Sequence, residues 1–99
     1  MKKRKDTYFK GKTAIVTGGS SGIGKATAKL LARNGSNVFI IARNQPKLNQ
    51  ALQEIRAEGS DTHQILRAFS ADVTDSEGVK ATIDAIVEAG ASPDILISS

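Results

Sequence analysis

A glycine-rich turn at residues 17–24 holds the residue types best suited to bind a phosphate group. It reads Thr-Gly-Gly-Ser-Ser-Gly-Ile-Gly, follows a short apolar segment, and precedes an amphipathic segment that begins at about Gly22. The first N–H groups of a helix have no partner within the helix, and the helix dipole adds partial positive charge there. A strand, a glycine turn and a helix N-terminus in this order predict a phosphate-binding site.

The residues of this turn have separate expected roles. Gly18 lets the turn close after the strand, Gly22 lets the backbone approach a pyrophosphate, and Gly24 lets the helix pack tightly on the strand. Hydroxyl or backbone donors to the phosphates come from Ser20, Ser21 and Ile23. The alternative is a tight strand-to-helix turn that binds no ligand.

Arg43 directly follows the apolar segment 37–42 and is the most informative single residue. Folds that bind NAD often carry an acidic residue at the end of the second strand, where it bonds the ribose 2′-hydroxyl. That position here is about Ala42, which is neutral. An arginine beside it can form two charge-assisted bonds with a 2′-phosphate, so the sequence predicts NADP(H) over NAD(H). The alternative is an ordinary surface arginine.

Alternating apolar patterns supply the elements that must position these residues. Strands are predicted at 13–17, 37–42, 65–70 and 94–98, and helices at 22–34, 46–58 and 75–89. This β-α-β-α-β-α-β order with short connections predicts an α/β fold, a parallel sheet with helices on both faces. The expected strand order is 3-2-1-4, the first half of a Rossmann-type doubly wound sheet. The ligand crevice then lies where the order reverses, between the C-terminal ends of the first and fourth strands.

The helix predicted over 22–34 carries an apolar stripe. It consists of Ile23, Ala26, Thr27, Leu30 and Leu31, which recur at the spacing of one helix face. We expect this stripe to be the face that packs on the sheet.

The glycine turn closely resembles the cofactor fingerprint of the short-chain dehydrogenase/reductase family, T-G-x-x-x-G-x-G. Thr17, Gly18, Gly22 and Gly24 match it, and the turn lies near the N-terminus as in that family. The resemblance implies an NADP(H)-dependent oxidoreductase that transfers a hydride between the nicotinamide and a small carbonyl or alcohol substrate. Members are commonly dimers or tetramers, so it also implies a homo-oligomer.

Two further segments resemble the same family. Asp72-Val73 matches the pair that flanks the adenine ring, which implies that Asp72 accepts a bond from the adenine amino group and Val73 packs on the ring. The alternative for Asp72 is a loop aspartate that caps a turn. In the last predicted strand, Ser98 and Ser99 stand where the family usually carries asparagine, so the role of that asparagine is open here.

The family's catalytic serine and its Tyr-x-x-x-Lys helix would follow residue 99, so we predict no catalytic residue in this chain. Tyr8 and Lys12 have the same spacing but precede the first strand, and we interpret them as a coincidence. Residues 13–99 are then the N-terminal part of a truncated NADP-binding Rossmann domain. The alternative is a non-catalytic nucleotide-binding module, or a naturally truncated product, of the same fold.

The runs at 18–25 and 40–44 resemble one branch of that family, the 3-ketodihydrosphingosine reductases, which reduce a long-chain 3-keto-sphingoid base with NADPH. This finer resemblance implies a lipid-like substrate and a place in sphingolipid metabolism. General short-chain reductases share many of these residues, so a general carbonyl reductase is the alternative.

Charge and composition exclude several other classes. The net charge of +4 arises in residues 1–12, which we interpret as a basic, flexible leader; the rest of the chain is nearly neutral. We therefore expect no nucleic-acid partner, although a basic-tailed nucleic-acid binder is the rival interpretation. The chain has no cysteine and a single histidine, His63, so we expect no metal site. No apolar run approaches the roughly 20 residues of a membrane-spanning helix, and we expect a cytoplasmic protein.

Overall fold

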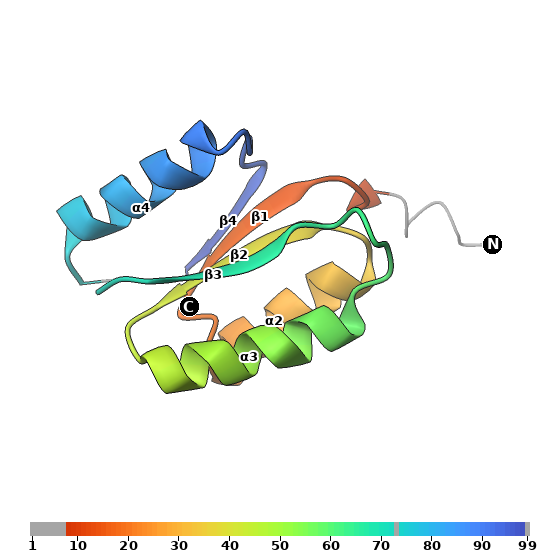
Figure 1. Cartoon of the computed structure of the whole chain (residues 1–99), viewed down its shortest axis with the longest axis horizontal. Coiled ribbons are helices and arrows are strands. Elements are labelled where there is room, and N and C mark those ends of the chain that lie inside the picture. The colour runs from red at the N-terminus through yellow and green to blue at the C-terminus, as the bar shows by residue number, and fades with distance from the viewer. Residues whose placement is uncertain (1–7, 73, 99) are drawn as a thin grey trace.

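Four parallel strands form one sheet in the order β3-β2-β1-β4, which confirms the predicted order. The computed structural model describes residues 8–72 and 74–98 (Figure 1). Its elements are β1 (Thr13–Thr17), α2 (Gly22–Arg33), β2 (Asn37–Ala42), α3 (Gln45–Glu58), β3 (Leu66–Ser70), α4 (Ser76–Glu88) and β4 (Ile95–Ser98). The strand order reverses between β1 and β4, so the chain has the switch point at which doubly wound folds bind their ligands.

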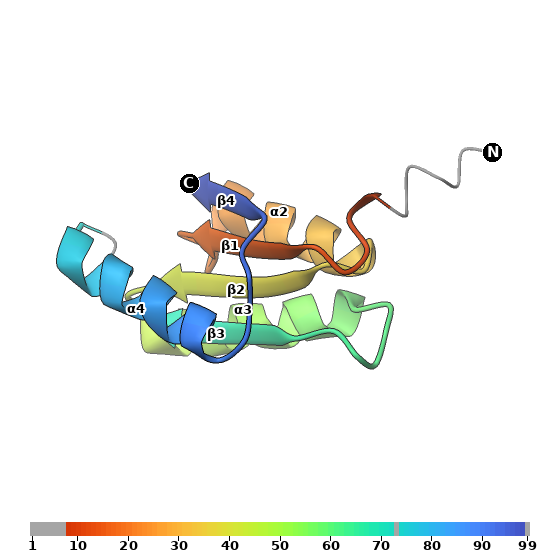
Figure 2. The same ribbon diagram turned by 90° about the horizontal axis from the view of Figure 1, so that it is seen from above.

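Helices cover both faces of the sheet. Figures 1 and 2 show α2 and α3 on one face and α4 on the other. The central strands β1 and β2 are buried along almost their whole length, because helices lie above and below them. This explains why these two strands are continuous apolar runs rather than alternating ones.

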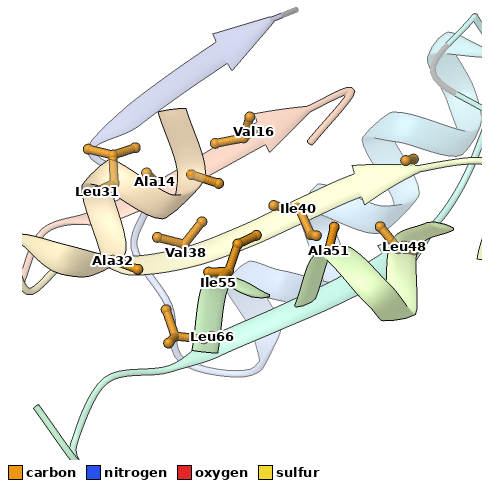
Figure 3. Packing of buried hydrophobic residues seen from close by; sticks show 12 residues of the cluster. Ala14, Val16, Leu31, Ala32, Val38, Ile40, Leu48, Ala51, Ile55 and Leu66 are labelled. Carbon is orange, nitrogen blue, oxygen red and sulfur yellow. The ribbon is translucent and has the colours of Figure 1, made fainter. Parts of the chain in front are cut away.

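The larger core lies between the sheet and the two helices α2 and α3 (Figure 3). Alternate residues of β1 and β2, such as Val16 and Ile40, point into it, while Ile15 and Ile41 pack on the other side, toward Ile86 of α4. Side chains contributed by α2, α3 and β3 complete the larger core: Ala28, Leu31, Ala32, Leu48, Ala51, Ile55 and Leu66. The layer formed by α2 and α3 therefore packs on β1 and β2 and positions the residues that follow these strands.

The buried face of α2 differs from the predicted one. Gly24, Ala28, Leu31 and Ala32 are buried, whereas Ile23 is 78% exposed and Leu30 is 53% exposed. The predicted stripe was therefore wrong except at Leu31. The helix has two adjacent faces that both fit helical spacing, and the face with glycine and alanine packs on the sheet because small residues let a helix lie closer.

Side-chain caps fix where α3 and α4 begin. The Asn44 carboxamide oxygen accepts a hydrogen bond from the Lys47 N–H at 3.0 Å, and α3 begins at Gln45, one residue earlier than predicted. The Asp75 carboxylate accepts from the Glu77 N–H at 3.1 Å, and α4 begins at Ser76. Both are the short polar residues that N-cap positions favour.

The described end of the predicted leader is attached to the fold. The Ser36 hydroxyl donates to the Phe9 carbonyl oxygen at 2.7 Å, and the Gly11 N–H donates to the Gly35 carbonyl at 3.1 Å. The Phe9 ring packs against the larger core. The folded unit thus includes Phe9, whereas residues 1–7 lie outside the described residues.

Candidate functional site

The glycine turn lies at the switch point of the sheet. It follows the C-terminal end of β1, with β2 on one side and β4 on the other. The Gly18 N–H donates to the Ile41 carbonyl at 2.8 Å, which ties the turn to β2, and Gly18 has a φ of 75°. Glycine adopts this left-handed conformation without steric cost, as the turn requires.

The N-terminus of α2 faces open space and has no side-chain cap. Ser21 occupies the N-cap position, yet its side chain makes no capping hydrogen bond, unlike Asn44 and Asp75 at the other two helices. Gly22 has a φ of 58°, and a Cβ added there would meet no atom within 4 Å. The first N–H groups of α2 are therefore open to an anion, which is the chemistry of a phosphate site.

Two other glycines allow the turn to pack closely on β2 and on the start of α2. A Cβ on Gly24 would overlap the carbonyl oxygen of Gly18, and a Cβ on Gly19 would overlap the Ile40 side chain. Gly24 thus brings the helix close to the turn at Gly18 and Gly19, whereas the sequence predicts its close contact with the strand. Gly19 was missed from the sequence, because it occupies a variable position of the fingerprint and its contact with β2 exists only in the folded sheet.

The structure brings Arg43 and Asp72 together just beyond the C-terminal ends of β2 and β3. The guanidinium Nη1 lies 3.4 Å from the Asp72 Oδ2, and the Arg43 side chain is 77% exposed. The neutral Ala42 beside it is buried. Arg43 is thus accessible to a ligand while it holds only an exposed ion pair.

Asp72 also forms a local turn. Its Oδ1 accepts from the Thr74 hydroxyl at 2.6 Å and from the Thr74 N–H at 2.9 Å. These bonds, the hydroxyl first, lower the pKa of the Asp72 carboxyl below its ordinary value, and the Arg43 charge adds to the effect. The predicted turn-capping alternative therefore describes part of what Asp72 does. Its predicted neighbour Val73 lies outside the described residues.

Ser20 and Ser21 line a hollow of about 160 Å³ between the turn and the two helices α2 and α3. The rest of its lining is Lys25, Lys47, Gln50 and Ala51. The two lysines were missed from the sequence, since neither is part of the fingerprint. The available signal was the position of Lys47 in the first turn of the helix that follows Arg43.

Ser98 connects β4 to β1 at the C-terminal ends of these two strands, the end of the sheet that also carries the glycine turn. The Thr17 hydroxyl donates to the Ile97 carbonyl and to the Ser98 Oγ, both at 3.4 Å. The serine thus joins β4 to the central strand β1 by a side-chain bond, while Ser99 lies outside the described residues. A second hollow of about 430 Å³ adjoins these residues on the α4 side, lined by Thr17, Ser76, Val79, Lys80, Ile83, Leu96 and Ser98.

Other candidate sites are absent from the described part of the chain. Within residues 8–72 and 74–98, no group of three or more His, Cys, Asp or Glu residues could hold a metal ion. No helix within those ranges has the length and apolar character needed to cross a membrane. Tyr8 and Lys12 lie before β1, at the opposite end of that strand from the glycine turn. This position agrees with their interpretation as a coincidence.

Comparison with known proteins places this site in a family. Residues 12–99 match the short chain dehydrogenase family profile. The 3-ketodihydrosphingosine reductase ksrA of Aspergillus fumigatus is 42% identical over 89 residues, which cover 87% of this chain and 24% of that protein. The chain thus spans about a quarter of the length of this relative.

Solved structures with the same fold bind either nicotinamide dinucleotide. An NAD⁺-bound xylitol dehydrogenase superposes with a TM-score of 0.80 at 33% identity, over 89% of this chain and 32% of that one. The L-sorbose reductase of Gluconobacter frateurii, complexed with NADPH and L-sorbose, superposes with a TM-score of 0.77 at 31% identity, over 88% of this chain and 32% of that one. The fold alone therefore does not determine whether a protein binds NAD(H) or NADP(H).

Proposed function

The chain belongs to the short chain dehydrogenase family, and from that premise we propose that it is the NADP(H)-binding part of an oxidoreductase. The observation that carries the proposal is the uncapped N-terminus of α2, which faces open space beside the glycine turn at the switch point. Backbone N–H groups and the helix dipole would hold the pyrophosphate there. The residues proposed for the cofactor site are Gly18, Ser20, Ser21, Gly22, Ile23, Gly24, Arg43, Asp72 and Val73.

Arg43 supports the choice of NADP(H) over NAD(H). The neutral Ala42 provides no carboxylate for a ribose 2′-hydroxyl, and Arg43 is exposed at the end of β2. Its ion pair with Asp72 is solvent-exposed, and such pairs contribute only about 0–1 kcal/mol. A 2′-phosphate is a doubly charged partner with several acceptor oxygens, so exchange of Asp72 for phosphate costs little. Asp72, once released, is available to the adenine amino group.

The described residues bind and orient rather than transfer protons. When bound, NADP(H) supplies hydride-transfer chemistry. The glycine turn would hold the pyrophosphate, Arg43 the adenosine end, and the edge where β1 and β4 end would direct the nicotinamide toward the substrate. We propose that the proton-transferring serine, tyrosine and lysine of the family lie beyond residue 99.

We propose a small carbonyl or alcohol as the substrate, and a 3-keto-sphingoid base as its specific form. The likeness to the Aspergillus fumigatus reductase supports this finer proposal. A cytoplasmic location and a homo-oligomeric state remain predictions of the sequence.

A non-catalytic nucleotide-binding module is the second candidate. It is supported by the same site geometry, the uncapped N-terminus of α2 and the exposed Arg43, since both features concern binding and neither concerns turnover. Reading the gene beyond codon 99 separates the two candidates, because a downstream Tyr-x-x-x-Lys sequence favours the oxidoreductase and a stop codon favours the module.

Calorimetric titration of the protein with NADP⁺ and with NAD⁺ tests the main proposal. We expect both nucleotides to bind and NADP⁺ to bind more tightly by tenfold or more, since charge-assisted bonds to phosphate contribute about 1.5–3 kcal/mol. Titration with ATP serves as the control for general phosphate affinity. A folded protein that binds neither dinucleotide would overturn the proposal.

A further inference from the structure

The dipeptide Asn34-Gly35 at the C-terminal end of α2 combines an amide side chain with a successor that lacks a Cβ. An asparagine is deamidated when the backbone nitrogen of the next residue attacks its side-chain carbonyl carbon, and a glycine leaves that attack unhindered. The other asparagines of the chain, Asn37, Asn44 and Asn49, precede valine or glutamine. Asn34 is therefore the asparagine with the most reactive successor.

Water is the only co-reactant that this deamidation needs. The Gly35 nitrogen loses its proton to solvent and forms a bond to the Asn34 Cγ, while the bond from Cγ to Nδ2 breaks and Nδ2 takes up a proton and leaves as ammonia. Water then adds to one of the two carbonyl carbons of the cyclic succinimide. The ring opens to aspartate or to isoaspartate, whose main chain runs through the former side chain. A neutral amide thus becomes a carboxylate.

Hydrogen bonds at the end of α2 engage both reacting groups in the folded protein. The Asn34 Nδ2 donates to the Leu30 carbonyl at 2.9 Å, and the Gly35 N–H donates to the Ala32 carbonyl at 3.1 Å. Gly35 is also buried, so its N–H points into the helix end rather than toward a solvent base. Attack on Cγ therefore requires this last turn of α2 to open.

Gly35 also holds the segment 9–12 that precedes β1. The Gly11 N–H donates to the Gly35 carbonyl at 3.1 Å, and a Cβ added to Gly35 would lie 3.2 Å from the Lys10 side chain. Isoaspartate at position 34 would add a methylene group to the main chain directly before these contacts. The new carboxylate would also lie at a helix C-terminus, where the helix dipole disfavours an anion. Deamidation would therefore displace the contacts that attach the segment.

We propose that Asn34-Gly35 is a deamidation site protected by the folded end of α2, and that its conversion releases the segment 9–12 from the fold. Opening of the last turn of α2 sets the rate, because the closed turn engages both reacting groups. The site lies at the opposite end of α2 from the glycine turn, so the inference is independent of the proposed cofactor binding.

Peptide mapping by mass spectrometry tests the protection. It measures the deamidation rate of each asparagine in the folded protein and in guanidinium chloride, at the same pH and temperature. We expect Asn34 to react fastest in the unfolded chain, and to react more slowly by about tenfold or more in the folded protein. Asn37, Asn44 and Asn49 are the internal controls. Equal rates for Asn34 in the two states, or an unfolded-state rate no higher than those of the controls, would overturn the proposed site.

Limited digestion with trypsin tests the release, because trypsin cleaves after lysine and the segment contains Lys10 and Lys12. We expect the deamidated protein to be cleaved at these lysines faster than the wild type, by about threefold or more. Asn34→Asp should accelerate the same cleavage, since it introduces the carboxylate. Asn49→Asp is the matched control, because it makes the same change at an exposed position of α3. Cleavage of the deamidated protein at the wild-type rate, or equal acceleration by Asn49→Asp, would overturn the release.

Discussion

Arg43 and Asp72 form an ion pair across the ends of two neighbouring strands, with 3.4 Å between Nη1 and Oδ2. They meet because β2 and β3 pair in parallel, with Ala42 opposite Ser70, so residues just beyond each strand end are neighbours. We propose that these two side chains contact different parts of one nucleotide, and the ion pair couples them before that ligand binds. We expect a ligand that engages the Arg43 guanidinium to release the Asp72 carboxylate from this ion pair.

The acidity of Asp72 depends first on Thr74. The Thr74 hydroxyl bond lowers the pKa of the Asp72 carboxyl from its ordinary value of 3.8, so the carboxylate persists further into acid. Its stabilising contribution is present at neutral pH and is lost as the pH falls through the lowered pKa, below about 3.8. We expect Thr74→Ala to raise the pKa of Asp72 toward 3.8 in an NMR titration of side-chain carboxyl carbons. Thr74→Ser keeps the hydroxyl and should leave the pKa low; an equal rise in both variants would contradict the assignment.

Gly24 is required by packing at the start of α2. A methyl group there would overlap the Gly18 carbonyl oxygen, so Gly24→Ala must displace the helix from the turn. We expect a loss of about 1–3 kcal/mol in the free energy of unfolding, measured by urea denaturation. Gly78→Ala in α4 is the control, since its Cβ would lie 3.1 Å from the Asp75 side chain, which can move. A Gly24→Ala protein as stable as Gly78→Ala would show that the turn adapts.

Ser36 holds the segment before β1 to the fold. Its side chain is fully buried, and its hydroxyl donates to the Phe9 carbonyl at 2.7 Å. Ser36→Ala removes one of two bonds to that carbonyl, which also accepts from the Lys12 N–H at 3.0 Å, so we expect a loss of about 0.5–1.5 kcal/mol in the free energy of unfolding. Ser92→Ala removes the same hydroxyl at an exposed loop position and should have little effect. Equal urea midpoints for the two variants would mean that water replaces the Ser36 bond.

The sequence was informative where local pattern determines structure. The strand order and the place of the glycine turn follow from alternating periodicities and short connections, which leave few topologies. The buried face of α2 was not predictable, because Ile23 and Leu30 fit helical spacing as well as Ala28 and Ala32 do. The hollow beside Ser20 and Ser21 was also not predictable, because it forms only when α2 packs on α3.

We propose that Arg43 selects NADP(H), and the ratio of NADP⁺ to NAD⁺ affinity in Arg43→Gln tests this selection. The matched control is Arg33→Gln, which removes another exposed arginine, at the far end of α2 from the glycine turn. We predict that Arg43→Gln lowers the ratio by tenfold or more through weaker NADP⁺ binding, with NAD⁺ binding and the control unchanged. An unchanged ratio in Arg43→Gln, or an equal fall in Arg33→Gln, would contradict the claim.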